Sequence, residues 1–181
     1  MSENVMKWNF REELRKLSKE QLVEYTYEVV AKSLWTLQSN YMMNLQKKYG
    51  DSVAEEFEIA AFGKFCEVQC YRIRKVFNLG DDMRAFVKLN NYSQMFPPNA
   101  EMEWSEISEK RARLRITYCP MQVNRRDVLG IHEYPCKKGD LAIVQKIASV
   151  FNPKLRTTCV YAPPDEHPKD AWCEWIYEIG D

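Results

Sequence analysis

The stretch Arg111-Ala112-Arg113-Leu114-Arg115-Ile116-Thr117-Tyr118 alternates polar side chains with apolar or aromatic ones at every second position. Successive side chains of a β-strand point to opposite faces of its sheet, so this pattern predicts a strand with one buried face. A similar alternation from Met102 to Ile107 precedes it, and together they predict an antiparallel hairpin with a turn at Ser108-Glu109. The arginines are then the wet face of a strand and not a phosphate track.

Upstream of Phe96-Pro97-Pro98, apolar residues recur at three- to five-residue intervals, which indicates helices. Ser18-Lys19-Glu20-Gln21 and Ser52-Val53-Ala54-Glu55 both have the pattern of a capping box, in which the first and fourth side chains satisfy free backbone donors. Gly50 is a natural stop for the first of these helices, whose length leaves room for one break. The expected helices span about residues 8–17, 18–50, 52–80 and 82–91.

Downstream of the hairpin, the pattern predicts one helix over 141–150 and two further strands over 155–161 and 172–179. The fold class is therefore α+β, with an N-terminal helical half followed by a mainly antiparallel sheet with one inserted helix. A length of 181 residues fits one domain, residues 1–181, with its helical half at about 8–91 and its sheet half at about 101–181.

The charges balance, with 26 Lys plus Arg against 26 Asp plus Glu. No overall field draws the chain to nucleic acid or to an anionic membrane, so we expect neither partner. Residues 1–7 lack the apolar core of a signal peptide, and no run approaches the roughly 18 apolar residues of a membrane span. We therefore expect a cytoplasmic protein, and the long first helix allows a homodimer.

Six cysteines in a reducing compartment argue against a disulfide framework. Cys66 and Cys70 lie four residues apart, on one face of an expected helix, and core filling is favoured over metal ligation there. The other four lie on or near the ends of expected elements: Cys119, Cys136, Cys159 and Cys173.

If the sheet brings these four cysteines together, their thiolates can hold a metal in tetrahedral geometry, with zinc as the default and an iron-sulfur cluster as the alternative. The spacings contain no Cys-x-x-Cys pair, so other interpretations stay open. Plain burial of all four is one of them. Another has a fourth ligand from Asp165, Glu166, His167 or Glu174. A third has a metal-free nucleophilic thiol beside Arg125, Arg126, His132 or His167.

Several motifs also resemble a family. They are Asn40-Tyr41-Met42-Met43, Tyr118-Cys119-Pro120-Met121-Gln122, Tyr134-Pro135-Cys136-Lys137, Cys159 to Asp165, and Cys173-Glu174-Trp175. Over nearly the whole chain they resemble an uncharacterised family of cytosolic proteins from anaerobic bacteria and archaea. More distantly, the chain is similar to the L-2-amino-thiazoline-4-carboxylate hydrolase family and to the 4-vinyl reductase domain.

The distant resemblance implies a helical part before an antiparallel sheet, with cysteines at the sheet edge beside a small-molecule pocket. Cys136, Cys159 and Cys173 are the positions that carry over. The Gly-Asp pair usual before the last cysteine is replaced by Lys169-Asp170-Ala171-Trp172, which departs from both distant families.

The resulting hypothesis is a domain that binds a small aromatic or heterocyclic molecule between its helices and its sheet, with cysteine-ligated zinc at the sheet end. As an enzyme it would hydrolyse a small carbon-nitrogen or carbon-sulfur compound, with Asp165, Glu166 or His167 carrying the proton. The candidate substrate-binding residues are Gln122, Arg125, His132 and Trp175. The alternatives are a ligand-binding or sensory module with a structural metal and an iron-sulfur redox protein.

Overall fold

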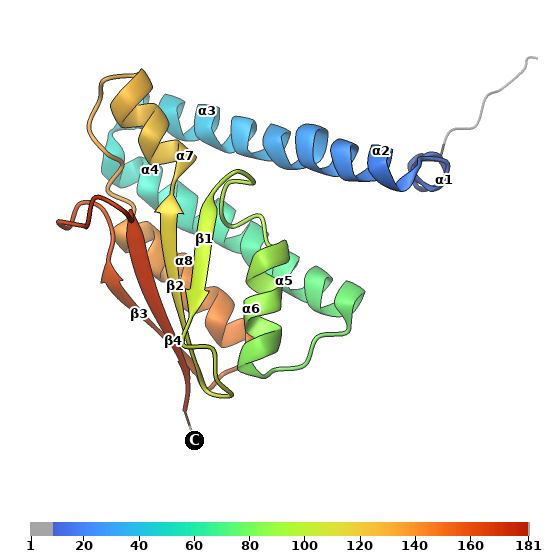
Figure 1. The fold of residues 1–181 in the computed structure, drawn as a ribbon. Helices are drawn as coiled ribbons and strands as arrows, with labels where there is room; N and C mark the ends of the chain where they lie inside the picture. The colour runs from blue at the N-terminus through green and yellow to red at the C-terminus, as the bar shows by residue number, and fades with distance from the viewer. Residues whose placement is uncertain (1–8, 181) are drawn as a thin grey trace, which may run out of the picture.

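The computed structural model describes residues 9–180. Its elements follow the expected order, with the helical half first and the sheet half second (Figure 1). The helical half contains α1 (Phe10–Arg15), α2 (Lys19–Glu24), η1 (Tyr25–Ala31), α3 (Lys32–Tyr49), α4 (Asp51–Phe57), η2 (Glu58–Phe62), α5 (Gly63–Phe77) and α6 (Met83–Tyr92). The sheet half contains β1 (Glu101–Ser105), β2 (Arg111–Tyr118), α7 (Pro120–Val123), η3 (Asn124–Val128), α8 (Lys137–Phe151), β3 (Leu155–Tyr161) and β4 (Cys173–Ile179). The segments labelled η are π-helical turns. The α+β prediction is confirmed.

The four strands form one antiparallel sheet in the order β1-β2-β4-β3. Ala112, Leu114 and Ile116 of β2 are buried on its inner face, as the alternating stretch predicts. The arginines between them lie on the outer face, where Arg113 pairs with Glu106 at 2.8 Å and Arg115 with Asp170 at 3.0 Å. The prediction that these arginines form the wet face of a strand is confirmed.

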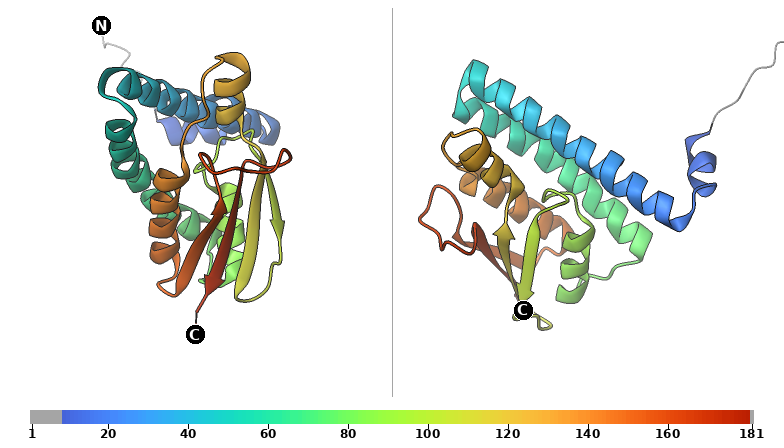
Figure 2. Two further views of the ribbon diagram at one scale, coloured as in Figure 1. Left: turned by 90° about the vertical axis from the view of Figure 1, so that its left-hand side faces the viewer. Right: turned by 45° about the horizontal axis from the view of Figure 1, so that its top comes forward.

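Helices cover only the inner face of the sheet. α8 packs on β3, α6 lies against β2, and α5 packs on α8 (Figure 1). The next layer is a long rod formed by α2, η1 and α3, which runs antiparallel to α4–α5 and projects past them (Figure 2). Cys66 and Cys70 are buried in the core, so the preference for core filling at these two positions is confirmed.

The observed helix ends show which local sequence signals predict a boundary correctly and which do not. The capping box at Ser18 is present, and Gly50 ends α3 at a φ of 87°, which favours glycine. The capping box expected at Ser52 is wrong, because α4 begins at Asp51 after Gly50 and has no side-chain cap. The break anticipated in the first helix is the π-helical turn η1, which leaves the rod continuous.

Two further differences lie in the sheet half. α8 begins at Lys137, four residues before the expected start, so that Cys136 is its N-cap residue. The α7–η3 segment after Cys119 was not predicted, although Pro120 stands at its first position, where proline is favoured. Within residues 9–180, no helix is both long and apolar enough to cross a membrane.

Candidate functional site: a cleft between α3 and the α7–η3 segment

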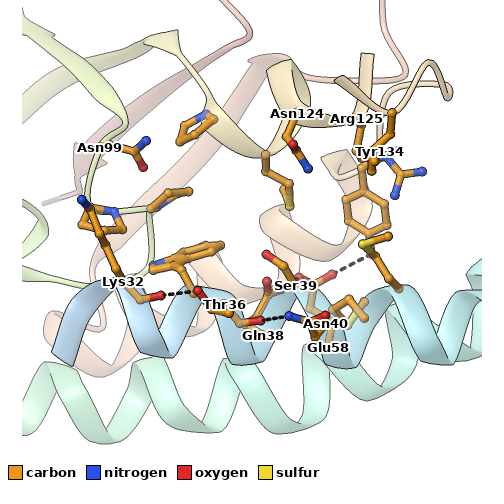
Figure 3. A pocket seen from close by; sticks show the side chains of 18 of the residues that line it. Lys32, Thr36, Gln38, Ser39, Asn40, Glu58, Asn99, Asn124, Arg125 and Tyr134 are labelled. Carbon is orange, nitrogen blue, oxygen red and sulfur yellow. Dashed lines mark hydrogen bonds between the residues drawn. The ribbon is translucent and has the colours of Figure 1, made fainter. Parts of the chain in front are cut away.

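A cleft of about 520 Å³ opens between α3 and the segment that joins β2 to α8. Trp35 and Gln38 of α3 line one side, and Met121, Asn124 and Arg125 of α7–η3 line the other. Tyr134 reaches toward α3 from the α7–η3 side, as Figure 3 shows. The volume lies within the range of about 300 to 1,000 Å³ that is typical of sites for small organic molecules.

A buried carboxyl group, that of Glu58, lies at the base of the cleft. The Gln38 Nε2 atom donates a hydrogen bond to its Oε1 atom at 2.9 Å, and the Tyr134 hydroxyl donates to its Oε2 atom at 2.7 Å. Burial raises the pKa of Glu58, and these two hydrogen bonds oppose that rise because they favour the charged form. The three side chains fix one another and connect α3, η2 and the segment before α8.

Tyr134 is held in place by Gln122, which is only 1% exposed. The Gln122 Nε2 atom donates to the Tyr134 carbonyl at 2.9 Å, and the Tyr134 amide donates to the Gln122 Oε1 atom at 2.8 Å. The Gln122 side-chain amide thus makes the same pair of hydrogen bonds to the Tyr134 backbone that a neighbouring β-strand would make. The residue predicted to bind substrate supports the wall of the cleft instead of facing its interior.

Arg125 brings a buried positive charge to the cleft, where it is 8% exposed. Its Nε atom donates to the His132 carbonyl at 3.0 Å, and its NH1 atom donates to the Gln46 Oε1 atom at 3.2 Å. Its guanidinium lies 5.6 Å from the centre of the Tyr134 ring. Among residues 9–180, no carboxylate forms an ion pair with this guanidinium, which has five N–H donors in all.

Two of the three π-helical turns each place an ionisable residue at the cleft, which Lys32 of α3 also lines. Glu58 is the first residue of η2, and Arg125 is the second residue of η3. A π-helical turn inserts one extra residue into a helix and re-aims the side chains that follow, and such turns are frequent at functional sites. Here they turn the carboxyl group of Glu58 and the guanidinium of Arg125 inward.

A smaller chamber of about 40 Å³ adjoins the cleft and shares Trp35, Glu58 and Met121 with it. Asp140, in the first turn of α8, lines this chamber and approaches Glu58. Burial and the nearby Glu58 carboxyl together raise the pKa of Asp140 to about 7, although a hydrogen bond with Cys136 opposes the rise. The chamber therefore holds a carboxyl group that changes protonation near neutral pH.

The four cysteines of the sheet half lie close enough to influence one another's ionisation. Cys119 and Cys173 line the chamber, and Cys136 lies beside Asp140. Burial raises the pKa of Cys119 and of Cys159 to about 11, and it raises those of Cys136 and Cys173 well above the usual value. An activated nucleophilic thiol needs the opposite shift, so the metal-free nucleophile hypothesis is not supported.

The sheet half thus gathers these four cysteines into one region of the fold. Within residues 9–180, no three His, Cys, Asp or Glu side chains are placed where they could share a metal ion. The zinc site predicted at Cys119, Cys136, Cys159 and Cys173, and the iron-sulfur alternative, remain predictions that the structure does not test.

The residues predicted as proton carriers lie on the loop between β3 and β4, beside a different surface hollow. Asp165 forms an ion pair with Lys137 at 2.6 Å and lines that hollow. His167 contacts the carbonyls of Pro168 and Ala171 through Nδ1 at 3.0 Å and the Glu133 carboxylate through Nε2 at 3.3 Å.

Glu166, the third of these residues, is exposed. The structure therefore places Asp165, Glu166 and His167 together on one loop but not beside the cleft. Their predicted roles as proton carriers remain predictions.

The four predicted substrate-binding residues occupy different positions. Arg125 lines the cleft and Trp175 lines the chamber, whereas Gln122 is internal and His132 is exposed. His132 contributes its backbone carbonyl to Arg125 and not its imidazole. The structure brings the first two to one connected site and leaves the other two around it.

Sequence reasoning missed Glu58, Asp140, Trp35 and Gln38. One signal for Glu58 was available, because it lies four residues from both Ala54 and Phe62 and so interrupts an apolar face with a charge. Asp140 similarly lies one helical turn after Cys136. Trp35 and Gln38 carry no such signal, since both residue types are common on any amphipathic helix.

The fold and the site together define an α+β domain whose helical rod and sheet half enclose a ligand-sized cleft with a cysteine- and carboxyl-lined chamber. Residues 15–179 match the model of a family of unknown function, DUF6125, and the chain belongs to this family. No curated protein and no solved structure matches the chain.

Proposed function

We propose that the protein binds a small organic anion, with a flat apolar body and a carboxylate or similar oxyanion, in the cleft between α3 and the α7–η3 segment. The observation that carries the proposal is Arg125, a buried guanidinium that lines the cleft and has no carboxylate partner in the described chain. A buried charge without a counter-ion is costly, and a bound anion would supply one. A planar guanidinium also matches a carboxylate with two parallel hydrogen bonds.

The walls of the cleft suit the rest of such a ligand. Trp35, Met42 and Met121 provide apolar and aromatic surface against which a ring could lie. The Nε1 atom of Trp35 and the Oε1 atom of Gln38 are buried there without a hydrogen-bond partner. These two atoms offer one donor and one acceptor, so a heterocycle with both kinds of polar atom fits better than a plain hydrocarbon.

Chemistry beyond binding stays a separate hypothesis. The resemblance to the L-2-amino-thiazoline-4-carboxylate hydrolases and to the 4-vinyl reductase domain rests on Cys173-Glu174-Trp175, and Cys173 and Trp175 both line the chamber. Within residues 9–180 no three metal-ligating side chains lie together, so we derive no step through zinc or an iron-sulfur cluster. Elemental analysis of protein purified without chelator tests this prediction, and about one zinc per chain would support the hydrolase or the metal-module hypothesis.

Thermal unfolding in the presence of matched ligands tests the binding proposal. Benzoate and nicotinate each have a neutral counterpart of nearly the same shape, benzamide and nicotinamide. A ligand that binds only the folded state raises the melting temperature, by an amount that grows with the logarithm of its concentration divided by its dissociation constant. We expect the carboxylates at millimolar concentration to raise the melting temperature by a few degrees and the amides to leave it unchanged.

The variant Arg125→Gln should abolish the effect of the carboxylates, because it removes the charge that recognises them. Arg72→Gln is the matched control, since Arg72 is exposed on α5 and lies outside the cleft. Equal responses to carboxylates and amides, or a full response in Arg125→Gln, would contradict the proposal. So would the absence of any response to a wider set of heteroaromatic carboxylates.

A further inference from the structure

An apolar groove of about 280 Å³ runs along the outer side of the helical layer, between α3 and the segment formed by α4, η2 and α5. Leu34, Leu37 and Tyr41 of α3 form one wall, and Phe57 and Phe65 form the other. Leu37 is 69% exposed, and Tyr41 and Phe57 are also exposed. The groove continues onto a rod whose earlier part exposes further apolar residues: Leu22, Val23, Tyr27, Val29 and Val30.

The charge pattern of α3 distinguishes this groove from ordinary helix surface. From Ser33 to Gln46 the chain contains no charged residue, although much of that segment is exposed. Exposed helix faces usually carry lysine and glutamate, whereas the centres of protein interfaces are depleted of charge and enriched in aromatic residues and methionine. The composition of the exposed segment is therefore that of an interface.

The rod also lacks support from its own chain. Between Phe10 and Val30, none of the described residues is buried, and α2 and η1 make most of their contacts with each other and with α3. A helix with so little tertiary packing is marginal in water, because most helical stability in proteins comes from burying one face. A partner against the groove would supply that burial.

We infer that a second copy of this chain occupies the groove, packed through a two-fold axis so that the helical layers of two protomers form a four-helix arrangement. Each protomer presents an antiparallel pair, α3 with α4–α5, which is half of such an arrangement. An isologous contact requires a surface that tolerates its own image, and the segment from Ser33 to Gln46 carries no charges that would repel their own copies. The charged residue that lines the groove, Glu58, is buried and hydrogen-bonded to Gln38 and Tyr134. The chain also has a formal net charge of zero, so two copies do not repel at long range.

The size of the face is adequate for a stable dimer. The 18 residues of α3 extend over about 27 Å, and two adjacent helices are about 20 Å wide. Their product is about 540 Å² per partner, or about 1,080 Å² for the pair, which clears the roughly 1,000 Å² in total that a specific interface needs. Gln38 and Met42 line both the groove and the cleft, so the same contact would hold α3 in place as a wall of the site.

Sedimentation equilibrium over a hundredfold concentration range tests this inference independently of what the cleft binds. We expect the wild-type chain to have twice the mass of one chain at micromolar concentration, with a melting temperature that rises with concentration. Leu37→Glu and Tyr41→Glu each place a charge in the groove, so we expect the dissociation constant to rise at least a hundredfold. Both side chains are exposed, so the fold of each protomer should persist, which circular dichroism checks.

Val128→Glu is the matched control, because Val128 is 71% exposed on η3, outside the groove. It should remain a dimer. A wild-type chain that is monomeric throughout the concentration range would overturn the inference. A monomeric chain that binds lipid vesicles or another protein through the groove would overturn it as well. A dimer that survives both Leu37→Glu and Tyr41→Glu would place the interface elsewhere and would overturn it equally.

Discussion

The cleft and the loop between β3 and β4 both collect polar residues, but they differ in how those residues are satisfied. On the loop, Asp165 is paired with Lys137, and both ring nitrogens of His167 have partners. In the cleft, Arg125 has no carboxylate partner in the described chain, and buried polar atoms of Trp35 and Gln38 have none at all. Polar groups that satisfy one another stabilise a fold, whereas groups left unsatisfied in a cavity wall are available to a ligand.

The largest expected effect concerns the support of the cleft. Gln122→Leu removes both hydrogen bonds to the backbone of Tyr134 and leaves a buried amide and carbonyl unpaired. We expect a loss of about 3 kcal/mol in the free energy of unfolding, measured by urea denaturation. Gln145→Leu, at an exposed position on α8, is the control and should change little. Similar midpoints for the two variants would show that Gln122 does not hold Tyr134.

The next largest effect is the pH dependence of stability that Asp140 gives the chamber, which distinguishes the chamber from the loop. The folded-state pKa of Asp140 is raised to about 7, above its value in the unfolded chain. Its contribution is therefore fully present below about pH 4 and is lost as the pH rises toward 7. The N-terminus of α8 favours the charged form and limits this loss.

Asp140→Asn removes this titration. Its free energy of unfolding relative to wild type should rise by a few kcal/mol between pH 4 and pH 8, because only the wild-type group must ionise in a buried site. Urea denaturation at several pH values measures the difference. Parallel pH profiles for the two proteins would mean that Asp140 is solvated as in the unfolded chain.

The fold was predictable because its signals are local. The alternation of Arg111 to Tyr118, the capping box at Ser18 and the glycine stop at Gly50 each depend on a few neighbouring residues. The start of α4 was misplaced because Ser52 has the right spacing but the backbone had already entered the helix at Asp51. The α7–η3 segment was missed because it is short and partly π-helical, so it has no regular period.

The site was only partly predictable, because it depends on which elements meet. Attention to the cysteines located Trp175 and the chamber wall, and Arg125 was identified as a candidate. The contact of Glu58 with Tyr134 joins residues 76 positions apart, and no local pattern reports such a distance. The charged residues around Pro163 to His167 drew attention by their density, which does not show whether they satisfy one another.

A smaller effect is expected on the loop at His167. Burial lowers the pKa of His167, but hydrogen bonds with Pro168, Glu133 and Ala171 outweigh it and leave the pKa raised. The stabilisation is thus present below the unfolded pKa and is lost as the pH rises through the folded one. After allowance for solvent screening, His167→Ala should cost about 0.5–1 kcal/mol at pH 5.5 and less at pH 8.5. An equal cost at both values would mean that packing on Trp172, and not charge, holds the ring.

The smallest effect is expected at Asp165, and it is the most decisive for the comparison. Asp165→Asn removes one half-exposed ion pair with Lys137, so the melting temperature should change by less than about 2 °C. The response to benzoate and nicotinate should be unchanged, because Asp165 does not line the cleft. Lys64→Gln, which removes the exposed pair with Glu67 on α5, gives the size of effect to expect from an ordinary surface pair. If Asp165→Asn instead abolished ligand binding, or any hydrolytic turnover, the loop would have to move onto the cleft when ligand binds. The distinction between satisfied and available polar groups would then describe only the empty protein.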